Sequence, residues 1–330
     1  MPEELTVQCA GELFAELLPA LGPVSTLSRF AEGSVTGAYR VEFARAESAP
    51  VVLKIYESDS LWCAAKEARA LRFLTSHGID VSPRALAFSK CADALGGRPC
   101  VVSSLRPGRT LTALDDELTP AQRFEIYRQL GEVLSRLHAI PAGGYGYVIG
   151  EIRDPRPDNA AHMARIFERE LRLFREHSAD SSLVDRLAGY VADRASAFTE
   201  CPRPAYCHGD VHEPNLLAEL AEDGGCSLTG LLDPLNMHAA DPLMEFVRLD
   251  AFSMQGDSTK IAGLLSGYGI PASEHQPGAW PDAWRSRLQL YRIALALELY
   301  NWFSSIGEPD PLPSLNRQLR ELTDESVSSA

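Results

Sequence analysis

The chain has 330 residues, with 31 lysines and arginines against 45 aspartates and glutamates, so its formal net charge at pH 7 is −14. An acidic chain without a basic block argues against a nucleic-acid partner, because such proteins carry a basic face. No apolar run reaches the length of a membrane span and residues 1–4 lack a basic signal region, so we expect a cytoplasmic protein with no membrane partner. The seven cysteines are scattered and never form Cys-x-x-Cys, which favours free thiols over disulfides or zinc.

The first hundred residues are predicted to form a small lobe rich in strands. In chain order we expect a helix at 3–20, strands at 27–31, 38–43 and 51–56, a helix at 62–76, and strands at 85–89 and 99–105. The turn at 32–37 joins the first two strands. Its backbone amides and the hydroxyls of Ser34 and Thr36 could cover phosphates, although a plain hairpin would look the same.

From residue 106 onward the pattern becomes helical. Helices are expected from Pro120 to about Leu137 and at 157–177, 183–199, 241–254 and 281–306, and one β segment at 215–218 and 228–233 interrupts them. We therefore predict an α+β chain with two lobes, residues 1–105 binding a nucleotide and residues 106–330 carrying catalysis and the second substrate. Ser103 and Leu105, at the hinge between them, could offer backbone groups to an adenine, as any buried strand could.

The sharpest chemical signal is His208-Gly209-Asp210, followed five positions later by Asn215. This spacing suits phosphoryl transfer: Asp210 can accept or orient the proton of an attacking hydroxyl, while the Asn215 carboxamide oxygen reaches a Mg²⁺ on the phosphates. The alternative is an ordinary polar turn. Asp233 stands at the carboxyl end of the next apolar strand, and with Asn215 it would supply the hard oxygen ligands that Mg²⁺ prefers.

Lys54 is the third signal, because it lies in the middle of an apolar strand in a chain with only four lysines. On the following helix Glu67 falls in the apolar stripe, whereas Lys66 falls outside it. A buried carboxylate needs a partner, so we expect Glu67 to pair with Lys54 and to aim its ammonium at the phosphates of a nucleotide. If Lys54 instead points to solvent from an edge strand, this role disappears.

In this order, Lys54, Glu67, the hinge, His208-Gly209-Asp210, Asn215 and Asp233 resemble the aminoglycoside phosphotransferase family of the protein-kinase-like fold. The helical segment 130–138 and the Gly-Tyr-Gly at 144–146 are also similar to that family. The spacing over 205–268 resembles hygromycin-B-type antibiotic kinases. The resemblance implies a bilobal kinase-like fold that uses ATP or GTP with Mg²⁺.

Two details of this resemblance concern the segment after Asp233. Asp241-Pro242 is similar to the family's Gly-Asp-Pro element, and the resemblance implies that Asp241 braces the catalytic loop. Glu245 stands where the family has an Asp, and Asp233-Pro234-Leu235 lacks the usual aromatic residue and second acid. These departures leave the surroundings of the metal open.

Three functions compete. A protein kinase needs a long segment after the metal aspartate, but only residues 234–240 separate Asp233 from Asp241, so we set it aside. An inactive nucleotide-binding module would be expected to lose one of Lys54, Asp210, Asn215 or Asp233, and all four are present. A small-molecule kinase remains.

The acceptor of that kinase is predicted to be a sugar or cyclitol hydroxyl of an aminoglycoside or another sugar-containing antibiotic, nucleoside antibiotics included. A metabolite kinase acting on a choline-like or sugar alcohol is the alternative. Carboxylates could attract a cationic acceptor, and the candidates are Glu245, Asp250 and Glu298. His212 could contact the transferring phosphoryl group or pack the loop. The sequence makes no prediction of oligomeric state.

Overall fold

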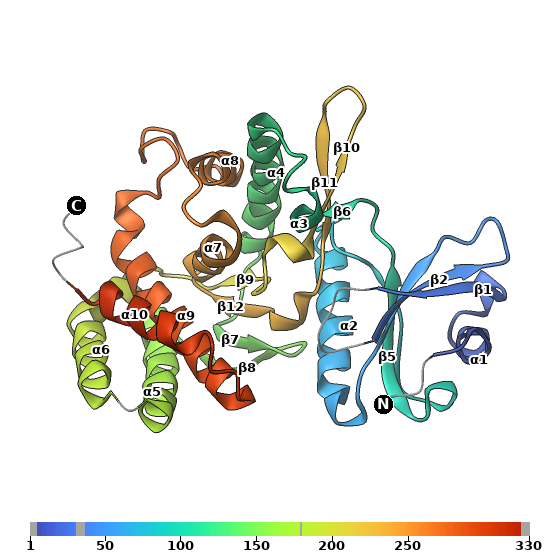
Figure 1. Ribbon diagram of the computed structural model, residues 1–330, viewed down its shortest axis with the longest axis horizontal. Coiled ribbons are helices and arrows are strands. Elements are labelled where there is room, and N and C mark those ends of the chain that lie inside the picture. Colours follow the sequence, from blue (N-terminus) through green and yellow to red (C-terminus); the bar gives the residue numbers. More distant parts are fainter. Residues whose placement is uncertain (1–4, 31–36, 179, 325–330) are drawn as a thin grey trace. The chain divides into compact units, whose positions relative to one another are not determined.

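The computed structural model describes residues 5–30, 37–178 and 180–324 (Figure 1). The chain packs as two compact units. The first unit comprises residues 1–122, 148–151 and 213–237, and the second comprises residues 123–147, 152–212 and 238–330. Residues 213–237 thus belong to the first unit, although the sequence assigns them to the helical lobe; the lobe boundary at residue 105 stays a prediction.

The first unit is built on an antiparallel five-stranded sheet in the order β1-β2-β3-β5-β4. Its strands are β1 (Val24–Arg29), β2 (Gly37–Phe43), β3 (Val51–Ile55), β4 (Ala85–Ala92) and β5 (Arg98–Ser104), and its helices are α1 (Val7–Leu17) and α2 (Leu61–Ser76). The predicted strands and both predicted helices are therefore present, with ends shifted by a few residues. The α+β prediction is confirmed.

Strand alternation gives this sheet two different faces. Leu53 and Val102 pack with Leu13 and Phe14 of α1 in one apolar cluster. Val101, one residue along β5, packs instead with residues of α2. Because successive side chains of a strand point to opposite faces, Lys54 lies on the α2 face, next to Leu53 on the α1 face. The sheet thereby sets a lysine against a helix.

A second, smaller sheet in the first unit consists of β6 (Arg109–Thr110), β10 (Leu216–Leu220) and β11 (Cys226–Leu231), next to the short helix α3 (Leu111–Leu114). In the β10–β11 hairpin, Leu216 pairs with Leu231. The predicted hairpin is confirmed, and its register places the residue before β10 and the residues after β11 at the same end.

The second unit is mainly helical. Its helices are α4 (Pro120–His138), α5 (Asn159–His177), α6 (Ser181–Arg194), α7 (Pro242–Leu249), α8 (Ser258–Tyr268), α9 (Arg285–Ile306) and α10 (Leu312–Leu322). In Figure 1, α10 lies along α9, which also contacts α5. The prediction missed α8 and α10.

A four-stranded sheet in the order β8-β7-β12-β9 was also missed. It joins β7 (Tyr145–Val148), β8 (Ile152–Arg156), β9 (Ala205–Cys207) and β12 (His238–Ala240). Strands of three to five residues from distant parts of the chain leave little periodicity to read. This sheet positions two segments of the predicted site, because β9 leads directly into His208-Gly209-Asp210 and β12 into Asp241.

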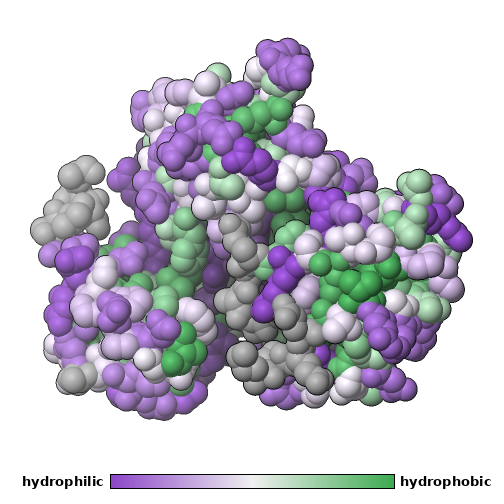
Figure 2. Space-filling view, turned by 45° about the vertical axis from the view of Figure 1, so that its right-hand side comes forward, coloured by the Kyte–Doolittle hydropathy of each residue, from purple (hydrophilic) through white to green (hydrophobic). Residues whose placement is uncertain are grey.

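Within the described residues, no helix is both long and apolar enough to cross a bilayer. The face of the molecule shown in Figure 2 is mostly hydrophilic, with its hydrophobic residues in separate groups. All seven cysteines are free thiols.

Candidate active site

Lys54 forms the predicted ion pair with Glu67. Lys54 Nζ lies 2.8 Å from a carboxylate oxygen of Glu67 on α2 and 3.5 Å from Oδ1 of Asp233. The Glu67 side chain is 5% exposed, whereas that of Lys54 is 21% exposed. Burial alone would lower the pKa of Lys54, but the two carboxylates raise it above its ordinary value. The ammonium therefore stays charged and remains accessible to a ligand.

Asn215 and Asp233 lie at one end of the β10–β11 hairpin. The Leu232 amide donates a 2.8 Å hydrogen bond to the Asn215 carbonyl oxygen, which ties the two segments together. Asp233 itself adopts the left-handed conformation, with φ 60° and ψ 63°, which is uncommon for a residue other than glycine and concentrates at functional sites. One amide oxygen and one carboxylate on a fixed hairpin end are a donor set that fits Mg²⁺.

The position of Lys66, which precedes Glu67 on α2, differs from the prediction. Lys66, expected outside the apolar stripe, is only 1% exposed. Burial lowers the pKa of its ammonium to about 7, with a small opposing effect of Cys63. Lys66 and Glu67 can both be buried because α2 contacts more than one neighbouring segment, β4 and β5 among them. A prediction from one apolar stripe assumes that the helix has only one buried face.

In the second unit, Glu245 on α7 holds the loop that carries Asp210. Its two carboxylate oxygens accept hydrogen bonds from the His208 amide at 2.9 Å and the Gly209 amide at 2.7 Å. The Nε2 atom of His138, at the end of α4, lies 3.1 Å from the same carboxylate. Burial by itself would raise the pKa of Glu245, but these donors and the nearby imidazoles lower it to about 2.

This arrangement corrects two expectations. Glu245 was expected to face a cationic acceptor, yet it is 2% exposed and its oxygens are occupied by the loop. Asp241 was expected to brace the catalytic loop, but its carboxylate accepts from the Leu243 amide at the start of α7 and from Arg287 and Tyr291 of α9. Asp241 joins two helices, and Glu245 is the brace.

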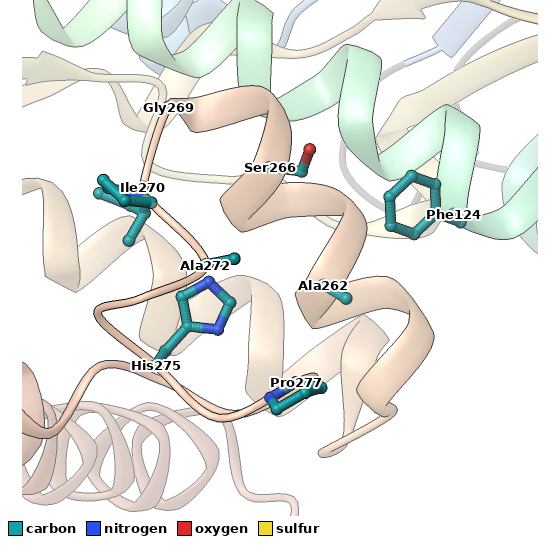
Figure 3. Close-up of a pocket in the computed structure, with 9 residues that line it drawn as sticks. Phe124, Ala262, Ser266, Gly269, Ile270, Ala272, His275 and Pro277 are labelled. Atoms are coloured by element: carbon teal, nitrogen blue, oxygen red, sulfur yellow. The ribbon is translucent and has the colours of Figure 1, made fainter.

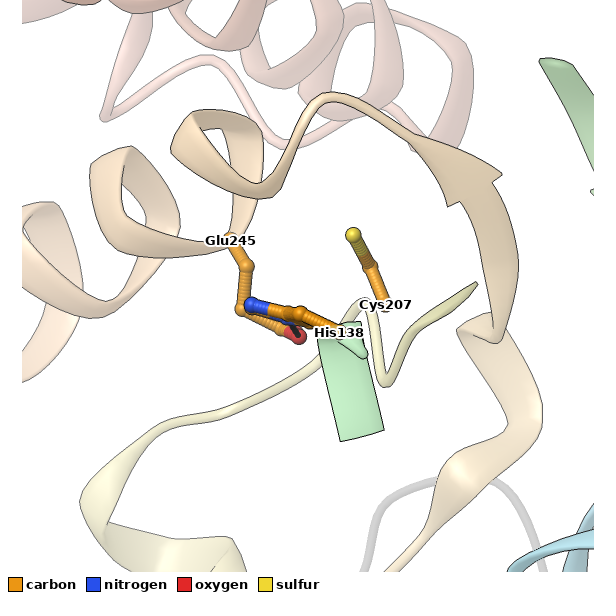
Figure 4. Close-up of side chains that lie close together, drawn as sticks. All are labelled: His138, Cys207 and Glu245. Carbon is orange, nitrogen blue, oxygen red and sulfur yellow. Dashed lines mark hydrogen bonds and ion pairs between the residues drawn. The ribbon is translucent and has the colours of Figure 1, made fainter. Parts of the chain in front are cut away.

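His138, Cys207 and Glu245 offer ligand atoms that all lie within 4.8 Å of one another, as Figure 4 shows. Hydrogen bonds already use the oxygens of Glu245. Since an ionised carboxylate can only accept, His138 Nε2 donates to it, and Nδ1 meets the Tyr268 hydroxyl at 2.9 Å. Burial raises the pKa of the Cys207 thiol well above its ordinary range. The geometry is that of a hydrogen-bonded brace.

Asp210 has a basic group beside each oxygen. His212 Nε2 lies 3.7 Å from Oδ2, and Arg248 Nη1 lies 4.0 Å from Oδ1. Burial opposes ionisation of this carboxyl, but His212 and Arg248 lower its pKa below the ordinary value. The Asp210 side chain is 25% exposed, so it can receive a ligand. Arg248 was not predicted, although it follows Glu245 by three positions and hence shares its helix face.

The remaining acidic candidates are also paired. Asp250 accepts from the Trp280 indole at 3.4 Å, from Arg292 at 3.2 Å and from the Gly256 amide at 3.0 Å. Glu298 on α9 accepts from Arg248 at 2.9 Å. The sequence located three acids correctly on helices of this unit, but it could not show that each one has a partner.

The other predicted nucleotide contacts lie in the first unit. Ser103 belongs to β5, where β3 and β4 flank it on both sides, and Leu105 follows the end of that strand. Their contact with an adenine stays a prediction. Ser34 and Thr36 lie outside the described residues.

The second unit also has two surface cavities of about 500 Å³ each. Figure 3 shows the first, bordered by Phe124 of α4, by Ala262 and Ser266 of α8, and by the loop that carries Ile270 and His275. None of the predicted site residues lines it. The second is lined by Trp284 and Arg287, and its lining also includes Asp241 and His138, the residue that contacts Glu245.

A lysine–glutamate pair on an antiparallel sheet, a hairpin ending in Asn215 and Asp233, and a braced His-Gly-Asp loop are features expected of a small-molecule phosphotransferase of the kinase-like fold. The chain belongs to the phosphotransferase enzyme family (APH), whose model matches residues 26–284. The suspected family is thereby confirmed, and the protein is an enzyme of the small-molecule kinase class.

Solved structures share this fold at low sequence identity. A thermostable mutant of aminoglycoside phosphotransferase APH(4)-Ia, in complex with ADP and hygromycin B, is 16% identical with a TM-score of 0.68, over 95% of this chain and 98% of that one. The GDP complex of wild-type aminoglycoside 2'-phosphotransferase-IIIa is 16% identical with a TM-score of 0.66, over 96% and 98%. A putative aminoglycoside phosphotransferase from Ralstonia eutropha is 16% identical with a TM-score of 0.62, over 97% and 96%.

Proposed function

We propose that the protein transfers the γ-phosphoryl group of ATP, or of GTP, to a hydroxyl of a small molecule. The acceptor class that we propose is a sugar or cyclitol of an aminoglycoside or another sugar-containing antibiotic, nucleoside antibiotics included, and the biological outcome is resistance or self-protection. The observation that carries the proposal is the Lys54 ammonium, which stays charged between Glu67 and Asp233 and remains partly exposed.

Each of the proposed site residues has one role in the transfer. Lys54 binds the phosphates of the nucleotide, and Glu67 keeps its ammonium in place. Asn215 and Asp233 would hold Mg²⁺, which when bound neutralises charge on the phosphates. Asp210 orients the acceptor hydroxyl and receives its proton as the hydroxyl oxygen bonds to the γ-phosphorus. The bond between that phosphorus and the bridging oxygen breaks, and the nucleoside diphosphate leaves.

The structures of related fold support the nucleotide and the acceptor class in this proposal. One holds ADP with hygromycin B, and another holds GDP. The brace on the Asp210 loop supports the role of that aspartate, because a catalytic group needs a fixed position to be effective.

The test is a panel of sugar antibiotics, nucleosides and amino alcohols, choline among them, incubated with the full chain, ATP or GTP, and Mg²⁺. Mass spectrometry should find an acceptor that gains one phosphate. Asp210→Ala should abolish this product and leave nucleotide binding nearly unchanged, because its contact is made mainly in the transition state. No product with any acceptor would favour an inactive nucleotide-binding module, and wild-type kcat in Asp210→Ala would remove Asp210 from the mechanism.

A further inference from the structure

Arg248 lies beside the proposed catalytic aspartate without belonging to the predicted site. Its Nη1 atom is 4.0 Å from Asp210 Oδ1, and its Nη2 atom donates a 2.9 Å hydrogen bond to Glu298. The Arg248 side chain is 20% exposed. A positive charge is therefore anchored next to the atom that must receive the acceptor hydroxyl.

The three acids predicted to attract a polycation in this unit already have hydrogen-bond donors. Glu245 is buried under the catalytic loop, Asp250 is bound to Arg292, and Glu298 is bound to Arg248. A polyamine sugar carries several ammonium groups, each of which favours a carboxylate with no other cationic partner. All three carboxylates predicted to serve that purpose have other donors.

An exposed aromatic ring completes this part of the site. Phe252 is 41% exposed, the Arg248 guanidinium carbon lies 5.8 Å from its ring centroid, and the His212 ring centroid lies 6.3 Å away. Phe252 belongs to the π-helical turn Asp250–Met254 that continues α7, and such turns are frequent at functional sites. A flat apolar ring and a guanidinium plane suit stacking against a planar group.

We propose that Arg248 determines acceptor specificity, and that the acceptor is an uncharged hydroxylated molecule with a planar ring, of the nucleoside class, rather than a polyamine sugar. This inference rests on the proposed function and narrows it. A hydroxyl that hydrogen-bonds to Asp210 Oδ1 lies within about 7 Å of Arg248 Nη1, since a hydrogen bond adds about 2.7 Å to the 4.0 Å separation. An ammonium next to that hydroxyl is repelled, and we expect it to lower kcat/KM about tenfold after screening by solvent and Glu298.

The experiment compares acceptors with the full-length protein, ATP and Mg²⁺. The uncharged probes are uridine and scyllo-inositol, and the cationic probes are kanamycin A and 2-deoxystreptamine, whose ring resembles that of the inositol but carries amines. The wild-type protein should prefer the uncharged probes by about tenfold or more in kcat/KM. Arg248→Gln should remove most of this preference with the KM for ATP unchanged, and Arg248→Lys should restore it.

Glu298→Gln provides a variant with the opposite expected sign. It removes the negative partner of Arg248, so discrimination against the cationic probes should increase. Arg172→Gln removes an arginine from a surface ion pair on α5 whose N–O distance, 2.9 Å, equals that of Arg248 and Glu298. This variant should leave the preference between the probes unchanged. Thermal unfolding of each variant establishes that it folds. If Arg248→Gln does not fold, the result with Glu298→Gln tests the specificity role.

Two outcomes would overturn the inference, and they differ. If kanamycin A is phosphorylated at least as well as uridine, or if the preference does not move in Arg248→Gln and Glu298→Gln, the specificity role is wrong while the proposed kinase function stands. If no probe gains a phosphate in any variant, the proposed function fails and this inference fails with it.

Discussion

Two buried glutamates, one in each unit, are used in different ways. The Glu67 side chain on α2 is 5% exposed and pairs with one lysine ammonium, which itself reaches the surface. Glu245 on α7 is 2% exposed and accepts from two backbone amides and an imidazole. Neither carboxylate is available to a ligand. The first fixes the position of a charge, and the second fixes the course of a backbone.

Because the two glutamates have different partners, loss of each one should have a different effect. Loss of the Lys54–Glu67 pair should weaken the use of a nucleotide, because the partly exposed Lys54 ammonium is the group that we propose binds its phosphates. Loss of Glu245 leaves buried amides without an acceptor, and a buried donor without a partner is costly to folding.

The largest effect on stability is expected from Glu245→Ala. The change removes the acceptor of the His208 and Gly209 amides, so the free energy of unfolding should fall by about 3–5 kcal/mol. Urea denaturation followed by tryptophan fluorescence measures it. Glu176→Ala, at an exposed glutamate of α5, is the control and should cost about 0.5 kcal/mol or less. Equal costs for the two variants would contradict the brace.

Lys54→Ala should act on catalysis. We expect kcat/KM for the nucleotide to fall about 100-fold, or about 2.7 kcal/mol, because a fixed charge on the phosphates is lost. Stability should fall less than in Glu245→Ala, since burial already raises the pKa of Glu67 and the carboxyl can take up a proton. Lys90→Ala, at an exposed lysine of the same sheet, is the control. An unchanged kcat/KM for the nucleotide in Lys54→Ala would mean that Lys54 does not bind its phosphates.

Gly267→Ala tests the packing of helices that supports the brace. A Cβ atom at Gly267 of α8 would overlap the Arg128 carbonyl oxygen of α4, and the next residue, Tyr268, contacts His138. We expect a loss of about 1–3 kcal/mol in thermal or urea unfolding. Gly189→Ala on α6, where a Cβ meets nothing within 4 Å, should instead stabilise by about 0.5–1 kcal/mol. A neutral Gly267→Ala would mean that the helices can separate at little cost.

A pH-dependent effect is expected from Lys66, whose burial lowers its pKa to about 7, against about 10.4 in an unfolded chain. Between these values the unfolded state binds more protons, so stability should rise with pH above 7, by about 2 kcal/mol up to pH 9. Below pH 7 the cost of the buried charge is fully present. Lys66→Met should remove this slope and stabilise the protein most at low pH. Unfolding free energies at pH 6, 7.5 and 9 measure it, with Lys90→Met as control; parallel curves for wild type and Lys66→Met would contradict it.

Much of the proposed site could be predicted because its signals are local. Lys54 stands out within one strand and Glu67 within one helix stripe, and the spacing from His208 through Asn215 to Asp233 spans a single loop and hairpin. The strands of the first sheet and the long helices follow from period-two and period-3.6 patterns, which depend only on neighbouring residues. These features decide the fold class and the order of the chemical groups.

Other features depend on contacts between residues far apart in the chain. The sheet that carries the Asp210 loop joins strands of three to five residues, and α8 contains Gly263 and Gly267, which count against a helix until α4 is seen to pass beside them. A buried face cannot be assigned before the partner surface is known. The sequence pattern therefore predicts Lys66 outside the buried side of α2 and Glu245 at the substrate, whereas the structure buries both. The sequence by itself determined which residues could do the chemistry. Tertiary structure decided which carboxylates were already occupied, and it placed Arg248 beside Asp210, because charge compensation depends on distances that long-range packing sets.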